Sequence, residues 1–143
     1  HPKWIEEIRQ LEDKGKGVYY YNYLGEKFPF IITGEISLIY TQERGRRIHL
    51  VILVPDIETA EKINAYFDTK GRRDYDGRPI FKISGEQFVK DMININRDIE
   101  IIPAHAWTPY FGVFGRHAMR RSFGWRRLTS SAPHTRRLPS CGR

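Results

Sequence analysis

Hydrophobic positions along the first 115 residues follow two alternating spacings, one typical of helices and the other typical of strands. Helical spacing predicts helices over residues 3–13, after Asp56 and after Ser84. Asp56 and Gly71 frame the second of these helices, and Ser84 begins a capping box with Gln87. Segments of strand character lie between the first two helices, at residues 18–23, 30–33, 36–41 and 47–54, and after the third, at residues 99–102.

The strand predicted over residues 47–54 has the strictest alternation in the chain. Its even-numbered positions, Ile48 to Val54, share one apolar face. His49 lies on the other face together with Val51 and Leu53, so its imidazole is expected to be buried. A buried histidine needs a partner, and a metal ion is one.

Glu35 and His105 also follow apolar segments. Glu35 follows the apolar run Phe30-Ile31-Ile32, and His105 follows residues 99–102. Carboxylate oxygen and imidazole nitrogen hold a catalytic Zn, Mn or Fe ion and leave coordination positions open for water. Each residue taken singly is more often solvated or hydrogen-bonded to a neighbour than a ligand. Their combination with His49 predicts a metal site at the carboxyl ends of adjacent strands, where catalytic residues collect in barrel-like α/β folds.

Helices that alternate with strands indicate an α/β fold with a largely parallel sheet. The strands are too few to close a barrel, so the fold class we predict is a partial (β/α) barrel. The chain of 143 residues is long enough for one domain with its own core. No apolar segment could cross a membrane and no signal peptide is recognisable. The single cysteine excludes an internal disulfide. We therefore expect a soluble, cytoplasmic protein with no membrane partner.

The net charge of +7 is confined to the end of the chain. Residues 1–115 hold 16 Lys and Arg against 17 Asp and Glu, which gives −1, whereas residues 116–143 hold eight Arg and no acidic residue, which gives +8. Three interpretations remain open: an arm that binds nucleic acid through Arg, Phe123 and Trp125, a disordered extension without a role, or a change of reading frame. We favour the last, because the tail has no helical or strand period and none of its basic residues is Lys. The predicted domains are accordingly 1–115 and a disordered basic tail, 116–143.

Three segments together resemble the polymerase-and-histidinol-phosphatase (PHP) superfamily: Gly34-Glu35-Ile36-Ser37, the strand with His49, and Pro103-Ala104-His105. The resemblance is greatest to its endonuclease Q branch, whose Ala-His-Ala-Trp-Thr-Pro segment followed by Phe-Gly matches residues 104–112. It covers residues 1 to about 115. It implies a distorted α/β barrel of PHP type with several divalent metal ions, Zn, Mn or Mg, and a partner that is DNA carrying deaminated bases.

The resemblance also implies roles for single residues. Glu35 resembles the bridging carboxylate of the family, His49 and His105 resemble two of its imidazole ligands, and His1 lies near a further ligand position. The opening Asp-x-His-x-His element and the late Asp-x-His element of the family are absent. A centre without these elements lacks part of its ligands. We therefore expect an incomplete, inactive copy.

Two groups of residues are candidates for substrate binding. Trp107, Tyr110 and Phe111 belong to an aromatic loop that could stack on a base removed from the helix, although such a loop more often packs on the rim of a barrel. Arg46 and Arg47 could contact phosphates, although short arginine pairs in turns are more often only solvated.

Three functions follow from these observations. The first is an endonuclease Q-like, metal-dependent phosphodiester hydrolase that cleaves DNA at deaminated bases. The second is a PHP-type phosphatase of small phosphorylated metabolites, which the same centre would serve. The third is a non-enzymatic, basic-tailed remnant that binds nucleic acid.

Overall fold

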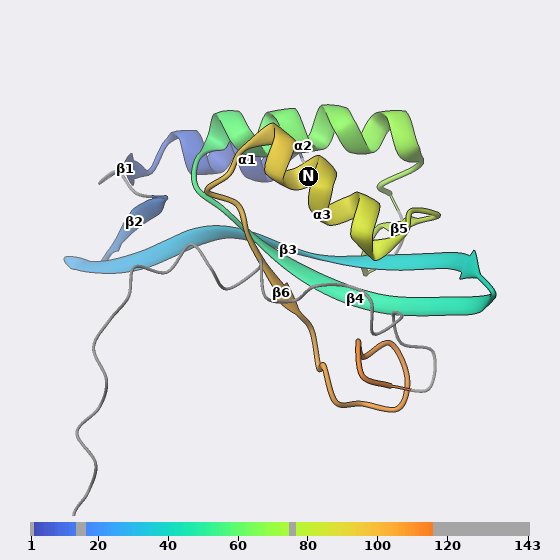
Figure 1. The fold of residues 1–143 in the computed structure, drawn as a ribbon. Coiled ribbons are helices and arrows are strands. Elements are labelled where there is room, and N and C mark those ends of the chain that lie inside the picture. The colour runs from blue at the N-terminus through green and yellow to red at the C-terminus, as the bar shows by residue number, and fades with distance from the viewer. Residues whose placement is uncertain (1, 14–16, 75–76, 116–143) are drawn as a thin grey trace, which may run out of the picture.

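Three helices lie together on one face of a six-stranded sheet in the computed structural model (Figure 1). The structure describes residues 2–13, 17–74 and 77–115. The predictions for His1 and for the tail 116–143 fall outside this part of the chain. In chain order the elements are α1 (Pro2–Arg9), β1 (Glu12–Asp13), β2 (Val18–Tyr23), β3 (Glu26–Gln42), β4 (Arg44–Val54), α2 (Ile57–Lys70), β5 (Ile80–Phe81), α3 (Gly85–Ile95) and β6 (Glu100–Pro103).

The centre of the sheet is a long antiparallel hairpin of β3 and β4. Glu43 joins the two strands with a φ of 62°, and a connection this short can only join antiparallel neighbours. β6 pairs with the outer edge of β4, also antiparallel. On the other edge of β3, β2 pairs with the first half, and β5 pairs in parallel with Ser37 and Leu38 of the second half.

The expected parallel sheet is therefore wrong, and so is the partial barrel as an architecture. The sheet is open and mostly antiparallel, while the α/β class holds only in the broad sense of mixed helix and sheet. The reason lies in β3, because the two short segments predicted at 30–33 and 36–41 are one strand that runs through Gly34 and Glu35. No helix separates β3 from β4, so nothing returns the chain for parallel pairing.

The second helix begins and ends where the sequence predicts, and the third begins where it predicts. Asp56 accepts a hydrogen bond of 2.6 Å from the Thr59 backbone N–H at the start of α2, and Gly71 closes its end. The Ser84 hydroxyl accepts one of 3.2 Å from the Gln87 backbone at the start of α3. The first helix is shorter than expected: α1 stops at Arg9, and residues 12–13 pair with β2 instead. None of the described helices is long and apolar enough to span a membrane.

The hydrophobic core lies between the helices and the sheet. It uses the apolar face of β4 that the alternation predicts, together with residues of β3, α2, α3 and β5. Phe67 of α2 stacks on Phe81 with ring centroids 4.6 Å apart, which joins the helix layer to the edge of the sheet. The largest fully buried side chains are Phe81, Phe88, Leu38, Ile48, Leu50 and Met92.

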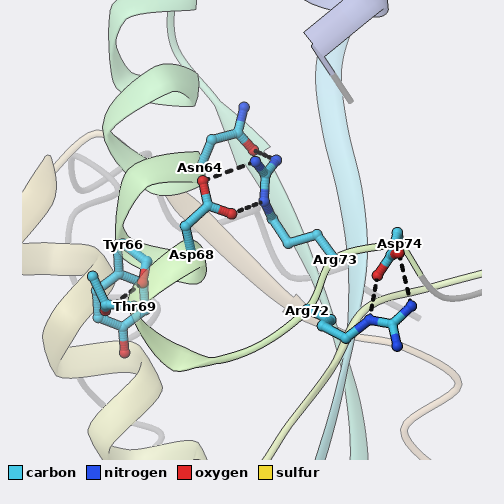
Figure 2. Close-up of polar contacts among 7 residues, drawn as sticks. All are labelled: Asn64, Tyr66, Asp68, Thr69, Arg72, Arg73 and Asp74. Carbon is cyan, nitrogen blue, oxygen red and sulfur yellow. Dashed lines mark hydrogen bonds and ion pairs between the residues drawn. The ribbon is translucent and has the colours of Figure 1, made fainter.

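The chain between α2 and β5 is fixed to the fold at both ends. At its start, Arg73 donates to Asp68 at 2.6 and 3.0 Å and to Asn64 at 2.9 Å, while Arg72 pairs with Asp74 (Figure 2). At its end, the Pro79 carbonyl accepts a hydrogen bond of 3.0 Å from the Ser37 backbone N–H. The segment that carries Arg78 and Pro79 is thus held beside β3.

Candidate metal centre

Glu35, His49 and His105 converge on the face of the sheet that the helices leave open. In the register of the hairpin, Ser37 lies opposite His49, and Glu35 lies two residues before Ser37 on the same face. His105 begins the loop after β6, which continues along β4 with a hydrogen bond of 3.1 Å from the Ala104 N–H to the His49 carbonyl. Figure 1 shows this loop on the side of the sheet opposite the helices.

The ligand atoms of these three residues all lie within 4.8 Å of one another. The predicted convergence is confirmed. Its predicted location is wrong, because Glu35 and His49 lie in the middle of antiparallel strands and not at the carboxyl ends of parallel ones. The residues still meet because cross-strand and diagonal neighbours on one face of an antiparallel pair are within side-chain reach.

The carboxylate of Glu35 has a geometry that suits a metal ligand. Its Oε1 lies 3.2 Å from Nδ1 of His49. Within the described part of the chain, it is the single buried side-chain polar atom that has no hydrogen-bond partner. Two atoms bound to the same ion at about 2.1 Å lie roughly 3.0–3.4 Å apart. The unsatisfied oxygen and its distance from the imidazole therefore fit a divalent metal ion held by Glu35, His49 and His105.

Arg78 also contacts this cluster, and sequence reasoning missed it. Its Nη2 lies 3.2 Å from Oε2 of Glu35, and its Nη1 lies 3.3 Å from Nδ1 of His49. Arg78 lies in a polar loop without periodicity, and the contact depends on the pairing of β5 with β3. The strand β5 is too short to be predicted from hydrophobic alternation, so the sequence could not place Arg78 beside Glu35.

The imidazole of His49 is enclosed on several sides. Its side chain is 6% exposed, with the Phe111 ring stacked on it at 4.3 Å and the His105 ring at 5.0 Å in an edge-to-face arrangement. Burial, and then the positive charge of Arg78, lower the pKa of His49 below its ordinary value, and the Glu35 carboxylate opposes this shift. His49 is accordingly neutral near pH 7, which is the form that binds metals.

The loop that carries His105 has a tightly wound backbone. His105 and Phe111, the two loop residues that contact His49, both have positive φ, 32° and 58°. For residues other than glycine, such a conformation costs on the order of 1 kcal/mol and is often found at functional sites. A Cβ at Gly112 would lie 2.7–2.8 Å from three backbone carbonyl oxygens of the loop, so only glycine fits there.

The aromatic residues of this loop differ in how far they are exposed to solvent. Phe111 is half-buried against His49. Trp107 is 81% exposed and stacks on Phe114 with centroids 4.4 Å apart, and Tyr110 is also exposed. Trp107 and Tyr110 are thus the two predicted stacking residues that stand at the surface.

The two arginines predicted to contact phosphate point to opposite faces. Arg47 lies opposite Ile39 on the face of Glu35 and His49, and it is exposed. Arg46 is 4% exposed, and its Nε donates to the Gln42 carbonyl at 3.3 Å. The predicted phosphate contact of Arg46 does not fit this burial, because alternation along β4 points its side chain to the face opposite the site.

A groove of about 1850 Å³ opens between α1, α2 and β3. It follows the part of the β3 edge that lies between the segments paired with β2 and β5. Glu35, Gly77 and Pro79 are among the residues that line it, so the groove extends along β3 as far as the strand position of the cluster.

No protein-family model and no curated protein sequence match this chain. Two solved structures have a similar fold. The lesion-specific endonuclease PfuEndoQ from Pyrococcus furiosus is 22% identical with a TM-score of 0.60, over 79% of this chain and 26% of that one. An endonuclease Q in complex with a 27-mer duplex that has an abasic lesion at the active site is 25% identical with a TM-score of 0.58, over 77% and 25%. The chain spans about a quarter of the length of these proteins, and its resemblance to endonuclease Q is confirmed at the level of the fold.

Proposed function

We propose that the described residues form part of a metal-dependent phosphodiester hydrolase of the endonuclease Q kind, which acts on DNA at deaminated bases. The observation that carries this proposal is the Glu35, His49 and His105 cluster, with its unsatisfied buried oxygen, on a fold similar to endonuclease Q. Glu35, His49 and His105 are the proposed metal ligands and thereby the catalytic residues. We do not extend the ligand set to His1, which lies outside the described residues.

The residues of the cluster suit phosphate chemistry. Divalent ions supply electrostatic stabilisation of phosphate oxygens and a water nucleophile that is active near neutral pH. Glu35 contributes negative charge on the open face of the sheet, and the neutral imidazole of His49 offers one nitrogen lone pair. His105 approaches from the loop that also carries Trp107, so metal ligand and base-stacking surface belong to one segment.

DNA is the proposed substrate because of the similar structures and the exposed aromatic loop. One neighbour contains a DNA duplex with an abasic lesion at its active site. Trp107 and Tyr110 offer ring faces beside His105 that could stack on a base moved out of the duplex. Arg47 lies on the same face of the hairpin and can reach phosphates.

The ligand assignment is tested by binding Mn²⁺ and Zn²⁺ to the 143-residue protein, measured by isothermal titration calorimetry. Glu35→Ala and His105→Ala should each weaken binding by more than about tenfold, since loss of an outer-shell partner alone costs about 10–100-fold. Glu100→Ala removes an exposed carboxylate from β6 and serves as the matched control. The ligand assignment is wrong if no ion binds, or if the Glu35 and Glu100 variants bind equally well.

The substrate assignment is tested with duplexes that contain uracil, inosine or an abasic site. The metal-loaded protein should bind these more tightly than undamaged duplex, and this preference should require Glu35. We expect little or no cleavage by this chain alone, because three ligand residues do not fix the geometry of a multinuclear centre. Robust cleavage that is lost in Glu35→Ala would contradict the expected inactivity and support the site.

A further inference from the structure

The guanidinium of Arg78 contacts two of the three proposed metal ligands. It contacts Oε2 of Glu35 at 3.2 Å and Nδ1 of His49 at 3.3 Å, both of them atoms of the proposed ligands. An arginine side chain is always protonated and has only donors. It can therefore donate to Oε2 of Glu35 and to Nδ1 of His49, but it cannot itself coordinate a metal.

The hydrogen bonds of the cluster are incompatible with one another in the absence of an ion. If Nδ1 of His49 accepts from Arg78, it has no proton to offer to Oε1 of Glu35, which lies 3.2 Å away. Two lone pairs then face each other, and the oxygen remains without a hydrogen bond. A cation held by Glu35 and His49 would satisfy the unpaired oxygen. If the ligand nitrogen is Nδ1, its single lone pair could not also accept from Arg78, and the two cations would compete for His49.

The side chain of Arg78 is partly exposed, whereas the chain that follows it is held to β3. It is 42% exposed, compared with 6% for His49 and 30% for Glu35. The next residue, Pro79, is fixed to β3 by the hydrogen bond from Ser37, and Ile80 pairs with the same strand. Displacement of the guanidinium therefore requires rotation of this partly exposed side chain and loss of its contacts with Glu35 and His49, but no movement of β5.

We propose that Arg78 is a displaceable internal cation: it neutralises Glu35 in the metal-free protein, is expelled from His49 by the metal, and then binds a phosphate of the substrate. The planar guanidinium matches two oxygens of a phosphate group, and Arg78 would remain next to the ions that hold the same group. The phosphate step rests on the proposed function, whereas the competition between Arg78 and the metal does not require DNA.

The first test is Mn²⁺ binding by the full chain, measured by calorimetry for wild type, Arg78→Gln and Arg78→Lys. Removal of the competing charge should tighten binding by about tenfold in Arg78→Gln, as expected for loss of a charged hydrogen bond, with Arg78→Lys in between. Arg73→Gln is the matched control, because Arg73 lies on the same loop but pairs with Asp68 and Asn64 of α2 (Figure 2). Its metal affinity should equal that of wild type.

The second test is binding of inorganic phosphate, and then of a short duplex, to the metal-loaded proteins. Arg78→Gln should bind phosphate about tenfold more weakly than wild type, although it binds the metal more tightly. These opposite shifts separate the proposed role from a structural one, in which both affinities would fall together.

Two patterns would overturn the inference. If Arg78→Gln binds Mn²⁺ as wild type does, or more weakly, while Glu35→Ala abolishes binding, the metal site stands and Arg78 does not compete for it. If neither wild type nor Arg78→Gln binds any metal, the proposed function fails together with the inference. A circular dichroism spectrum equal to that of wild type checks that each variant is folded.

Discussion

The neighbours of His49 make its protonation a property of the whole cluster. Burial and the guanidinium of Arg78 favour the neutral imidazole, whereas Glu35 favours the protonated one, and the first two effects prevail. The alternation of residues 47–54 was sufficient to predict this burial, because successive side chains of a strand point to opposite faces of the sheet. The sequence could not reveal Arg78, whose contact arises from the pairing of two distant segments.

The lowered pKa of His49 predicts how the stability of the metal-free protein depends on pH. The unfolded chain binds the proton near pH 6.5, and the folded chain binds it only at lower pH. The free energy of unfolding should therefore be highest above pH 6.5 and decrease as the pH falls below it. Chemical denaturation at pH 7.5 and 5.5 should show a larger decrease for wild type than for His49→Gln. Equal decreases for both proteins would show that other groups account for the pH dependence.

Phe111 and Trp107 belong to one loop but should behave differently when each is changed to alanine. The Phe111 ring is stacked on His49, so Phe111→Ala should weaken metal binding by about tenfold through loss of an orienting contact. Trp107 is highly exposed and does not contact the ligands in any described interaction. Trp107→Ala should leave the metal affinity unchanged within about twofold and weaken binding of lesion-containing DNA by about tenfold. Calorimetry and a fluorescence binding assay measure the two effects, and identical behaviour of the two variants would contradict this division.

At the scale of elements, the long hairpin decides how the ligands meet. A parallel arrangement would have required a helix between β3 and β4, and the turn at Glu43 is too short to contain one. The antiparallel pairing follows from this short turn. The sequence did not predict one continuous β3 because of the pair Gly34 and Glu35, since a glycine inside a strand pattern indicates an interruption of the strand. Here the strand continues because Glu35 faces the open side of the sheet, where a charged side chain can lie.

The loop of residues 105–115 depends on Gly112 for its shape. In Gly112→Ala the new methyl group would collide with the carbonyls of His105, Ala106 and Thr108. The loop would have to open, at an expected cost of about 1–3 kcal/mol in the free energy of unfolding. Metal affinity should fall as well, because His105 and Phe111 would move away from His49. Gly45→Ala, where a methyl group meets nothing within 4 Å, is the control. If thermal and calorimetric measurements find the two variants alike, the loop does not shape the site.

At the scale of the whole molecule, charge divides the chain into two parts that we propose to be independent. Residues 1–115 have a net charge of −1, although they hold the proposed site for an anionic substrate. Two of their arginines, Arg72 and Arg73, pair with acidic residues nearby (Figure 2). The positive charge available for long-range attraction to DNA is therefore concentrated in residues 116–143, which lie outside the described residues.

This division predicts what removal of residues 116–143 will do. The free energy of unfolding of residues 1–115 should change by no more than about 0.5 kcal/mol, since we propose that the tail does not pack on the domain. Affinity for undamaged duplex should fall greatly, and the remaining binding should depend less on salt. The reason is that each of the eight tail arginines that contacts a phosphate releases counterions from the DNA. An unselected, arginine-rich tail would bind any polyanion in this way. A preference for damaged duplex that disappears in Phe123→Ala or Trp125→Ala would instead show that the tail takes part in recognition, and it would overturn its interpretation as a change of reading frame.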